Sequence, residues 1–191
     1  MFFLFLVGNP THPKPVKLIA SLICNQAEFF YLALKKMIIH WGDIDFVSEI
    51  MDFDFTHYYE PEMGKNLWRR IISFKTLISP DKIATIKHLT NQIEKLLSSK
   101  PKKRTVNVDP GYINEYHLIL STTKPCPHRP YLNAGIYADL TLIYKEKSFH
   151  ALPWTYPDYR SEEIIAIMNS LRSKYLFQLR KGLFWNSDSD N

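Results

Sequence analysis

Val16-Lys-Leu-Ile-Ala-Ser-Leu-Ile-Cys24 is the stretch of sequence that decides the fold. Its side chains are almost all apolar, which is typical of a buried strand. Asn25-Gln-Ala-Glu28 follows directly and has the form of a capping box, so a helix is expected to begin here. Apolar residues at helical spacing continue as far as Trp41, and Gly42 predicts the end of this helix.

The same signals return further along the chain. Residues 46–55 alternate apolar and polar side chains and predict a second strand, and residues 67–75 predict a third. A cap, a proline and an apolar stripe predict a helix over residues 79–97, and residues 105–109 predict a fourth strand. This βαββαβ order predicts an α+β protein with a ferredoxin-like core, whose sheet is mixed but mainly antiparallel.

The remaining sequence predicts extra strands and a C-terminal helix added to that core. Residues 115–121 fit a strand or a helix, because a short apolar run does not settle the period. Residues 136–144 alternate clearly and predict a strand, and residues 148–152 could return beside it as a hairpin partner. Ser161-Glu-Glu163 predicts the start of a helix that continues through Arg180.

Length and composition favour a single domain. The 191 residues suffice for one buried core without disulfides or metal, and we expect this globular domain over residues 14–182. Residues 1–13 are expected to form an N-terminal extension, and residues 183–191 a polar C-terminal tail. The apolar start is short and followed by prolines, so we expect no membrane association.

The charge and the cysteine content limit the compartment and the partners. The 24 basic and 19 acidic residues leave a net charge of +5, which favours anionic partners only weakly because the excess is small and spread out. Two cysteines, Cys24 and Cys126, are too few for the disulfide framework of a small secreted protein. The simplest expectation is a protein of the reducing cytoplasm.

Short motifs of rigid and polar residues are densest between Asp109 and Arg160. Buried polar groups are costly unless they meet each other or a ligand, so this density predicts a binding site. The motifs are Asp109-Pro-Gly-Tyr112, Thr122-Thr-Lys124, His128-Arg129, Tyr137-Ala-Asp139 and Trp154-Thr-Tyr-Pro-Asp-Tyr-Arg160.

The residue types in these motifs suit an anionic ligand. Lys124 and Arg129 could hold a phosphate or a carboxylate, while Asp109 and Asp139 could bind ligand hydroxyls or a metal such as Mg²⁺. An imidazole is a common proton-transfer group, so His128, together with Asp109, is the candidate for catalysis if the protein is an enzyme. The residues predicted to bind the ligand are Tyr112, Thr123, Lys124, Arg129, Tyr137, Asp139, Tyr156, Asp158 and Arg160.

Structural explanations account for part of the same pattern. Pro110 and Gly111 fit a turn that Asp109 would cap, and Arg129 fits a pair with Asp139 or Asp158. The aromatic residues before the last helix fit packing as well as they fit stacking on a ligand. The polar residues expected on the open face of the sheet fit a solvated surface with scattered ion pairs; they include Asp52, Asp54, Arg69, Ser73 and Lys75.

Several well-known motifs are missing from the sequence. It contains no phosphate-binding P-loop, no dinucleotide-binding glycine turn and no G-x-S-x-G nucleophile elbow. Cys126 and His128 have no second pair at zinc spacing, so a structural zinc site is not expected. The reaction, if there is one, is therefore not named by a motif.

The ordered set of motifs resembles a bacterial family known as domain of unknown function 4416. The resemblance covers nearly the whole globular chain and rests on Phe53-Asp-Phe-Thr-x-Tyr-Tyr59, Met63-Gly64, Ser73-Phe74, Leu77-Ile-Ser-Pro80, Asn107-Val-Asp-Pro-Gly-Tyr112, Thr122-Thr-Lys124, His128-Arg129 and Trp154-Thr-Tyr-Pro-Asp-Tyr159. The resemblance implies a small soluble protein. Some members carry a GTP-binding label, but this sequence lacks every standard guanine-nucleotide motif.

Three hypotheses of function follow from the sequence. The first is a cytoplasmic protein that binds a phosphorylated small molecule or a nucleotide in a cleft built from the motifs between Asp109 and Arg160. The second is an RNA-binding module that uses an open sheet and basic segments such as Lys102-Lys-Arg104. The third is a structural or assembly protein, in which the polar cluster only stabilises the fold.

Overall fold

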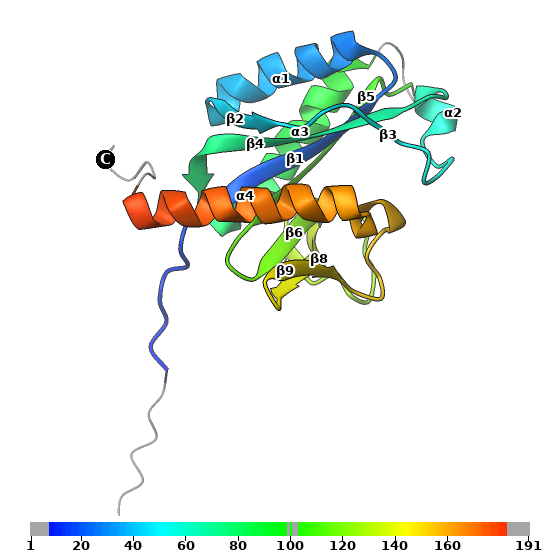
Figure 1. Cartoon of the computed structure of the whole chain (residues 1–191). Helices are drawn as coiled ribbons and strands as arrows, with labels where there is room; N and C mark the ends of the chain where they lie inside the picture. Colours follow the sequence, from blue (N-terminus) through cyan, green and yellow to red (C-terminus); the bar gives the residue numbers. More distant parts are fainter. Residues whose placement is uncertain (1–7, 99, 101–102, 183–191) are drawn as a thin grey trace, which may run out of the picture.

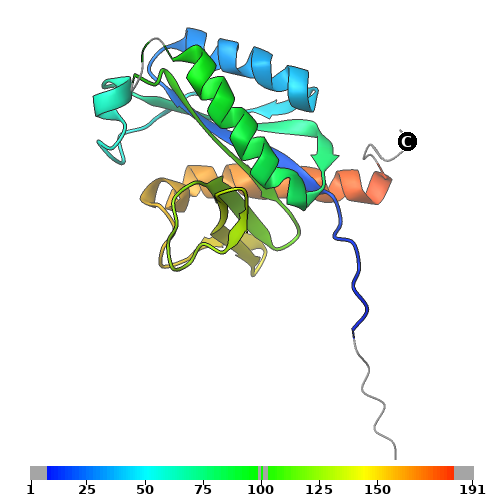
Figure 2. The same cartoon turned by 180° about the vertical axis from the view of Figure 1, so that it is seen from behind.

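One large antiparallel sheet organises the chain, with helices on both of its faces (Figures 1 and 2). The computed structural model describes residues 8–98, 100 and 103–182. Its nine strands follow the order β2-β4-β1-β5-β6-β8-β7, while β3 pairs with β4 and β9 pairs with β8. Every strand pair within these residues is antiparallel, so the expectation of a mixed sheet is wrong.

The first half of the sheet carries two helices on one face. Strand β1 lies between β4 and β5, and β2 forms the edge beyond β4. Helices α1 and α3 lie side by side on this face and contact each other (Figure 2). The elements are β1 (Val16–Cys24), α1 (Ala27–Trp41), β2 (Ile44–Val47), β3 (Met51–Asp52), α2 (Glu60–Met63), β4 (Trp68–Ile78), the 3-10 turn η1 (Pro80–Lys82), α3 (Ile83–Leu97) and β5 (Val106–Ile113).

The second half of the chain extends the sheet and covers part of its other face. Residues 115–121 were ambiguous from the sequence, and 117–121 of them lie in strand β6. Helix α4 crosses the sheet opposite α1 and α3 (Figure 1). These elements are β6 (His117–Thr122), β7 (Tyr131–Asn133), β8 (Ile136–Lys145), β9 (Ser148–Ala151), the 3-10 turn η2 (Pro157–Arg160) and α4 (Glu162–Lys181).

Strand β1 divides the interior because its alternate side chains face opposite layers. Leu18, Ala20, Leu22 and Cys24 belong to the core beneath α1 and α3. Ile19 belongs to a second core beneath α4, together with Leu142, Phe149, Met168 and Leu171. All nine residues of β1 are buried, which confirms the strand predicted from the apolar run.

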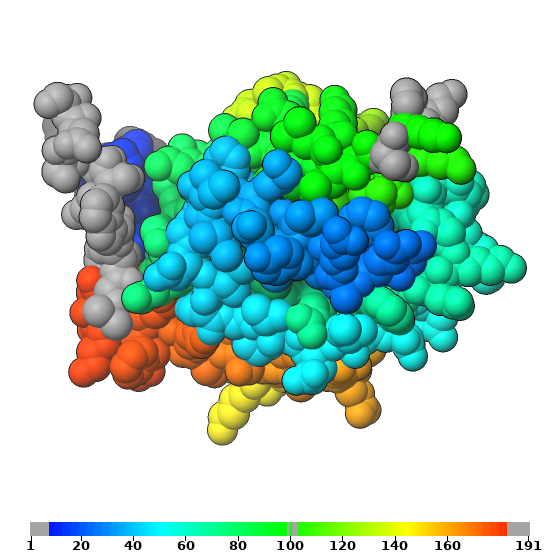
Figure 3. Space-filling model, turned by 90° about the horizontal axis from the view of Figure 1, so that it is seen from above, coloured from blue at the N-terminus to red at the C-terminus, as the bar shows by residue number. Residues whose placement is uncertain are grey.

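Helix α1 lies at the surface of the molecule (Figure 3), and it exposes the large apolar side chains Tyr31, Ile38 and Ile39. The helix was expected to begin with a capping box, but Gln26 is the N-cap and no side chain caps the first turn. Asn25 instead donates a hydrogen bond to the carbonyl oxygen of Met63, 2.8 Å away. The C-terminal end at Gly42 is as predicted, because the Gly42 N–H bonds to the Ile38 carbonyl.

Two local predictions fail where the backbone departs from a simple pattern. The expected strand over residues 46–55 is two short strands, β2 and β3, separated by an irregular segment. Asp109-Pro-Gly-Tyr112 was expected to form a turn, but the whole motif lies inside β5. The pairing of β5 with β6 begins at Gly111, so Pro110 lies just outside that ladder, where its missing N–H costs no bond.

Helix α4 is fixed at both ends. The Ser161 hydroxyl accepts a hydrogen bond from the Ile164 N–H, where the sequence predicted the helix to start, and Gly182 ends the helix in the left-handed conformation. Towards its C-terminal end, Gln178 accepts a hydrogen bond from Lys17 Nζ at 2.8 Å. The same ammonium, which is fully buried, lies 2.5 Å from a carboxylate oxygen of Asp45.

The ends of the chain lie partly outside the described residues. Residues 8–13 are exposed and form no regular structure, and residues 14 and 15 lead into β1. The first seven residues of the predicted extension, the polar tail over 183–191, and Lys102 of the basic loop are outside the description. Within residues 8–98, 100 and 103–182, no helix combines the length and apolar character needed to cross a membrane.

Candidate functional site

A pocket of about 500 Å³ lies on the same face of the sheet as α4, beyond the part that this helix covers. Its size is within the range of sites for small molecules and cofactors. Strands β4, β5, β6 and β8 contribute its base, and helix α3 contributes one side. The loop after β3 and the segment around η2, which are far apart in the sequence, contribute most of the rest, and Arg104, Thr123 and Lys124 complete the lining.

Aromatic rings form much of the pocket wall. They come from the loop after β3 and from the residues before α4, and they are Phe53, Phe55, Tyr58, Tyr59, Tyr156 and Tyr159. Tyr59 and Tyr159 are largely buried, and burial raises the pKa of each phenol well above its usual value. Both therefore remain neutral hydrogen-bond donors at physiological pH.

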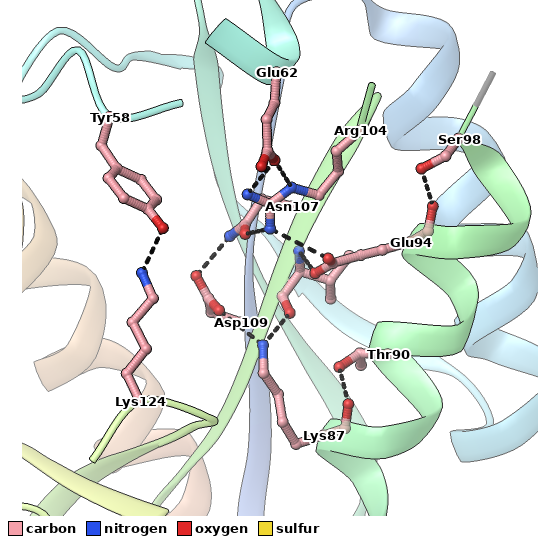
Figure 4. Close-up of polar contacts among 11 residues, drawn as sticks. Tyr58, Glu62, Lys87, Thr90, Glu94, Ser98, Arg104, Asn107, Asp109 and Lys124 are labelled. Carbon is pink, nitrogen blue, oxygen red and sulfur yellow. Dashed lines mark hydrogen bonds and ion pairs between the residues drawn. The ribbon is translucent and has the colours of Figure 1, made fainter. Parts of the chain in front are cut away.

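A network of charged groups forms the side of the pocket next to α3 (Figure 4). Lys87 Nζ lies 2.9 Å from Asp109, whose other oxygen accepts a hydrogen bond from Asn107 at 2.6 Å. Arg104 donates to Asn107 at 2.7 Å and lies 3.3 Å from Glu94. These contacts hold the four charged side chains of the network in fixed positions: Lys87, Asp109, Arg104 and Glu94.

The two carboxyl groups of this network respond differently to their surroundings. Burial raises the pKa of Glu94, and the positive charge of Lys87 opposes this only in part. Burial also disfavours the charged form of Asp109, but the charge of Lys87 and the hydrogen bonds from Lys87 and Asn107 outweigh it, so the pKa of Asp109 is lowered. Asp109 is therefore an ionised acceptor, whereas Glu94 is the more basic carboxyl.

A second pair of buried charges lies at the base. Arg69 bonds to the Asp158 carboxylate through one terminal nitrogen, and both side chains are almost completely buried. The guanidinium carbon lies 4.6 Å from the centre of the Phe53 ring and 5.0 Å from that of Tyr159. Two rings and one carboxylate thus hold the guanidinium in place.

Arg129 lies behind the pocket wall instead of lining it. Its Nε donates to Asp139 at 2.8 Å, and a terminal nitrogen donates to the Tyr156 hydroxyl at 2.5 Å. The side chains of Arg129 and Asp139 are both mostly buried. Burial opposes the positive charge, but Asp139 and the Tyr156 hydroxyl raise the pKa of Arg129 above its usual value.

Lys124 differs from the other cations that line the pocket. Arg69, Lys87 and Arg104 each contact a carboxylate, but Lys124 has no carboxylate within salt-bridge distance in the described part of the chain. Its Nζ donates a hydrogen bond to the Tyr58 hydroxyl at 2.8 Å and lies 4.1 Å from the centre of the Tyr58 ring (Figure 4). The positive charge at this exposed position is available to a ligand.

The fold brings some of the predicted ligand-binding residues together and separates others. Asp109, Thr123, Lys124, Asp139, Tyr156 and Asp158 line the pocket. Tyr112 packs in the core beneath α1 and α3, because a residue three positions after Asp109 in a strand faces the other way. Tyr137 packs edge-on against Tyr131, and Arg160 donates to the carbonyls of Pro153 and Thr155.

His128, the candidate for proton transfer, does not line the pocket. Its ring stacks on Trp154 with the centroids 5.2 Å apart, and Nδ1 lies 3.5 Å from the Cys126 sulfur. Its Nε2 is buried without a hydrogen-bond partner within the described residues. The contacts of this histidine are thus with its own loop and with the segment before α4.

The residues expected on the open face of the sheet also have different positions. Asp52 and Asp54 are exposed, because Met51 and Phe53 take the inward positions. Lys75 is exposed as well, and Ser73 donates a hydrogen bond to Asp45 at 2.6 Å, away from the pocket. Of Asp52, Asp54, Arg69, Ser73 and Lys75, only Arg69 lines the pocket.

Sequence reasoning missed the contribution of helix α3. Lys87, Asn91 and Glu94 follow the spacing i, i+4, i+7 and therefore share one side of the helix. Charged residues of a helix are usually solvated, and only this spacing beside the apolar stripe could have indicated a buried polar face. The tyrosines Tyr58 and Tyr59 were part of a quoted motif but were not assigned a place in the site.

The carboxylates of the pocket do not form a preformed metal site. Within residues 8–98, 100 and 103–182, no group of three or more His, Cys, Asp or Glu side chains could hold a metal ion. Asp109 and Asp139, which were suggested as ligands for Mg²⁺, each bond to a separate cation. These two carboxylates therefore serve the ion-pair networks described above.

Comparison with known proteins identifies the family of the chain. A family model described as Domain of unknown function (DUF4416) matches residues 14–175, and the chain belongs to this family. The match confirms the resemblance seen in the motifs. No curated protein matches the sequence. No solved structure matches it either.

Proposed function

We propose that this protein binds a phosphorylated small molecule or a nucleotide in the pocket beside α3. The observation that carries the proposal is the position of Lys124, a cation without a carboxylate partner among the described residues, at a pocket with aromatic walls. Thr122 and Thr123 add hydroxyl groups beside it. An ammonium and hydroxyls suit a phosphate, and aromatic rings suit the planar part of a nucleotide.

The charge balance of the pocket favours a ligand with one phosphate group. Three lining cations, Arg69, Lys87 and Arg104, are compensated by carboxylates, so only Lys124 offers uncompensated charge in the described pocket. A triphosphate would bring several negative charges toward Asp109, Asp139 and Asp158. We therefore expect monophosphates to bind better than triphosphates.

Thermal denaturation with and without ligands tests the proposal. We expect inorganic phosphate or a nucleoside monophosphate to raise the melting temperature, since a ligand that binds the folded state stabilises it by mass action. Each ligand is measured with and without Mg²⁺. Lys124→Ala should abolish most of the shift and leave the melting temperature of the ligand-free protein nearly unchanged, because Lys124 is exposed.

Lys145→Ala is the matched control for this experiment. Lys145 is an exposed lysine at the far end of β8 and does not line the pocket, so its removal should leave the ligand-induced shift intact. If none of the phosphates and nucleotides shifts the melting temperature of the wild-type protein, the proposed function is wrong. An equal loss in both variants would indicate non-specific charge attraction.

The proposal also includes the fold type and the compartment. The order β2-β4-β1-β5, with α1 and α3 on one face, supports a ferredoxin-like core that carries added strands and α4. The free thiols of Cys24 and Cys126 are compatible with a reducing cytoplasm. A proton-transfer role for His128 and Asp109 stays a prediction, and the binding proposal does not depend on it.

The two other hypotheses receive less support from the contacts. Arg104, part of the basic segment considered for RNA, bonds to Glu62 at 2.9 Å and to Glu94, so its charge is already compensated. The buried pair of Arg129 with Asp139 fits the assembly hypothesis, because both groups stabilise the added layer. Lys124, which is exposed and unpaired with acid in the described chain, has no such structural task.

A further inference from the structure

Three buried polar atoms at the base of the pocket lack hydrogen-bond partners in the described part of the chain. They are the Ser21 hydroxyl, the Arg69 Nε and the Tyr159 hydroxyl. Their residues are 1%, 5% and 3% exposed, respectively. A buried donor without a partner costs about 1–3 kcal/mol, and the Arg69 N–H can only donate, so this site calls for an external acceptor.

The three atoms come from neighbouring elements and face the same layer. Ser21 lies opposite Asp109 in the pairing of β1 with β5. Arg69 lies on β4, on the other side of β1, where it is opposite Ile23. Tyr159 comes from η2, and both Arg69 and Tyr159 line the pocket. The Ser21 hydroxyl is close enough to act as a hydrogen-bond partner that opposes the burial-raised pKa of Tyr159, although within the described residues neither hydroxyl makes a hydrogen bond of normal geometry.

The donors are held rigidly, as expected of a binding site. The Arg69 guanidinium lies between the Phe53 and Tyr159 rings and is bonded to Asp158 through a different nitrogen. Its Nε–H therefore cannot turn toward another acceptor without breaking these contacts. An arginine N–H only donates, so the group that completes this cluster has to accept a hydrogen bond.

We infer that Arg69 and Tyr159, with Ser21 behind them, form a subsite for the oxo group of a planar ring, so that the ligand is an oxo-bearing nucleoside monophosphate. This inference rests on the proposed function and names the ligand class within it. The phosphate lies at Lys124, the ring between the aromatic walls, and its carbonyl oxygen accepts from the buried donors. A ring with an amino group at that position would present a donor to Arg69 and lose affinity.

Inosine and adenosine monophosphate provide the test, because they differ at C6 in an oxo against an amino group. Uridine and cytidine monophosphate provide the same comparison at C4 of a smaller ring. We expect calorimetric titration to show at least about tenfold tighter binding of the oxo member in one of the two pairs. Tyr159→Phe should remove a hydrogen bond to it and weaken its binding about three- to tenfold.

The stability of the ligand-free variants separates binding from structure. The Tyr159 hydroxyl has no partner in the described chain, so Tyr159→Phe should leave the melting temperature unchanged or slightly higher. Tyr175→Phe is the matched control: this buried hydroxyl donates to the Pro15 carbonyl at 3.1 Å, away from the pocket. That variant should lower the melting temperature and leave nucleotide affinity unchanged.

The outcomes distinguish this inference from the proposed function. If wild-type protein binds the monophosphates and Lys124→Ala weakens the binding, but neither oxo preference nor an effect of Tyr159→Phe is found, the subsite is wrong and the pocket proposal stands. A lower melting temperature of Tyr159→Phe with unchanged affinity would point to buried water at the donors and would also overturn the subsite. If no monophosphate binds the wild-type protein, both are wrong.

Discussion

Glu94 is the residue whose ionisation should leave a clear trace in the stability of the protein. Burial raises the pKa of this carboxyl, Lys87 and Arg104 lower it, and the nearby Asp109 raises it further. The folded state then binds its proton more tightly than the unfolded chain, where the pKa is about 4.3. The free energy of unfolding should therefore fall as the pH rises from about 4.3 through the raised pKa.

Glu94→Gln should remove this pH dependence. Glutamine keeps an oxygen that can accept from the Val108 N–H, now 2.7 Å from Glu94, but it does not titrate. Urea unfolding between about pH 4 and pH 7 should show the variant gaining stability relative to wild type as the pH rises. The exposed control Glu49→Gln should show no such trend. An advantage of the wild type that grows with pH would contradict the assignment.

Strand β5, which carries Asn107 and Asp109 of the pocket, packs tightly against β6 at Gly111. Gly111 approaches β6 so closely that a Cβ atom at this position would lie 2.4 Å from the Ile119 carbonyl oxygen. Gly111→Ala should destabilise the protein by about 1–3 kcal/mol or more, because the backbone of β6 would have to move. Chemical unfolding measures this loss, and Gly8→Ala, which meets nothing within 4 Å, should cost little. Equal stability of both variants would rule out the close approach.

The order of the elements could be predicted from the sequence because each carries its own periodic signal. The run of β1, the stripe of α3 and the cap of α4 are local patterns, and the structure contains all three elements. The strand pattern at residues 46–55 failed because it spans a break between β2 and β3. Pro110 and Gly111 predicted a turn because both residues are common in turns. The local sequence does not reveal that β6 pairs with β5 only from Gly111 onward, which lets the strand continue through Pro110.

At the scale of the whole molecule, a buried ion pair joins parts of the chain that are far apart in sequence. Lys17 of β1 contacts Asp45 of β2 and Gln178 of α4, and Lys174 of α4 lies 3.8 Å from the same carboxylate. Burial lowers the pKa of Lys17, while the bond to Asp45 opposes this change. Because Gln178 and Lys174 contact this pair, α4 is held across the sheet.

Asp45→Ala should destabilise the whole domain by about 3–5 kcal/mol, because it leaves the buried Lys17 ammonium without its carboxylate. Urea unfolding provides the measurement. The exposed neighbour Asp43 is the matched control, and Asp43→Ala should change stability by less than about 0.5 kcal/mol. A double variant, Lys17→Met with Asp45→Leu, should recover much of the loss. Failure of Asp45→Ala to destabilise would show that other groups compensate the charge.

The pocket could be predicted only in part, because it is a property of the whole molecule. The motifs between Asp109 and Arg160 supplied Lys124, Asp158 and other lining residues. The contributions of α3 and of the loop after β3 required the packing of helix on sheet, which no single motif records. Tyr112 was assigned to the site because of its neighbours, although the alternation of β5 directs it away from Asp109.

The position of Lys17 also bears on how the protein matures on the ribosome. Gln178, which accepts one of its hydrogen bonds, lies 161 positions further along the chain and is therefore made later. Until the last helix has left the exit tunnel, the second face of the growing sheet stays uncovered and the ammonium stays hydrated. A nascent chain that contains all the strands but stops before α4 should thus be a substrate for chaperones.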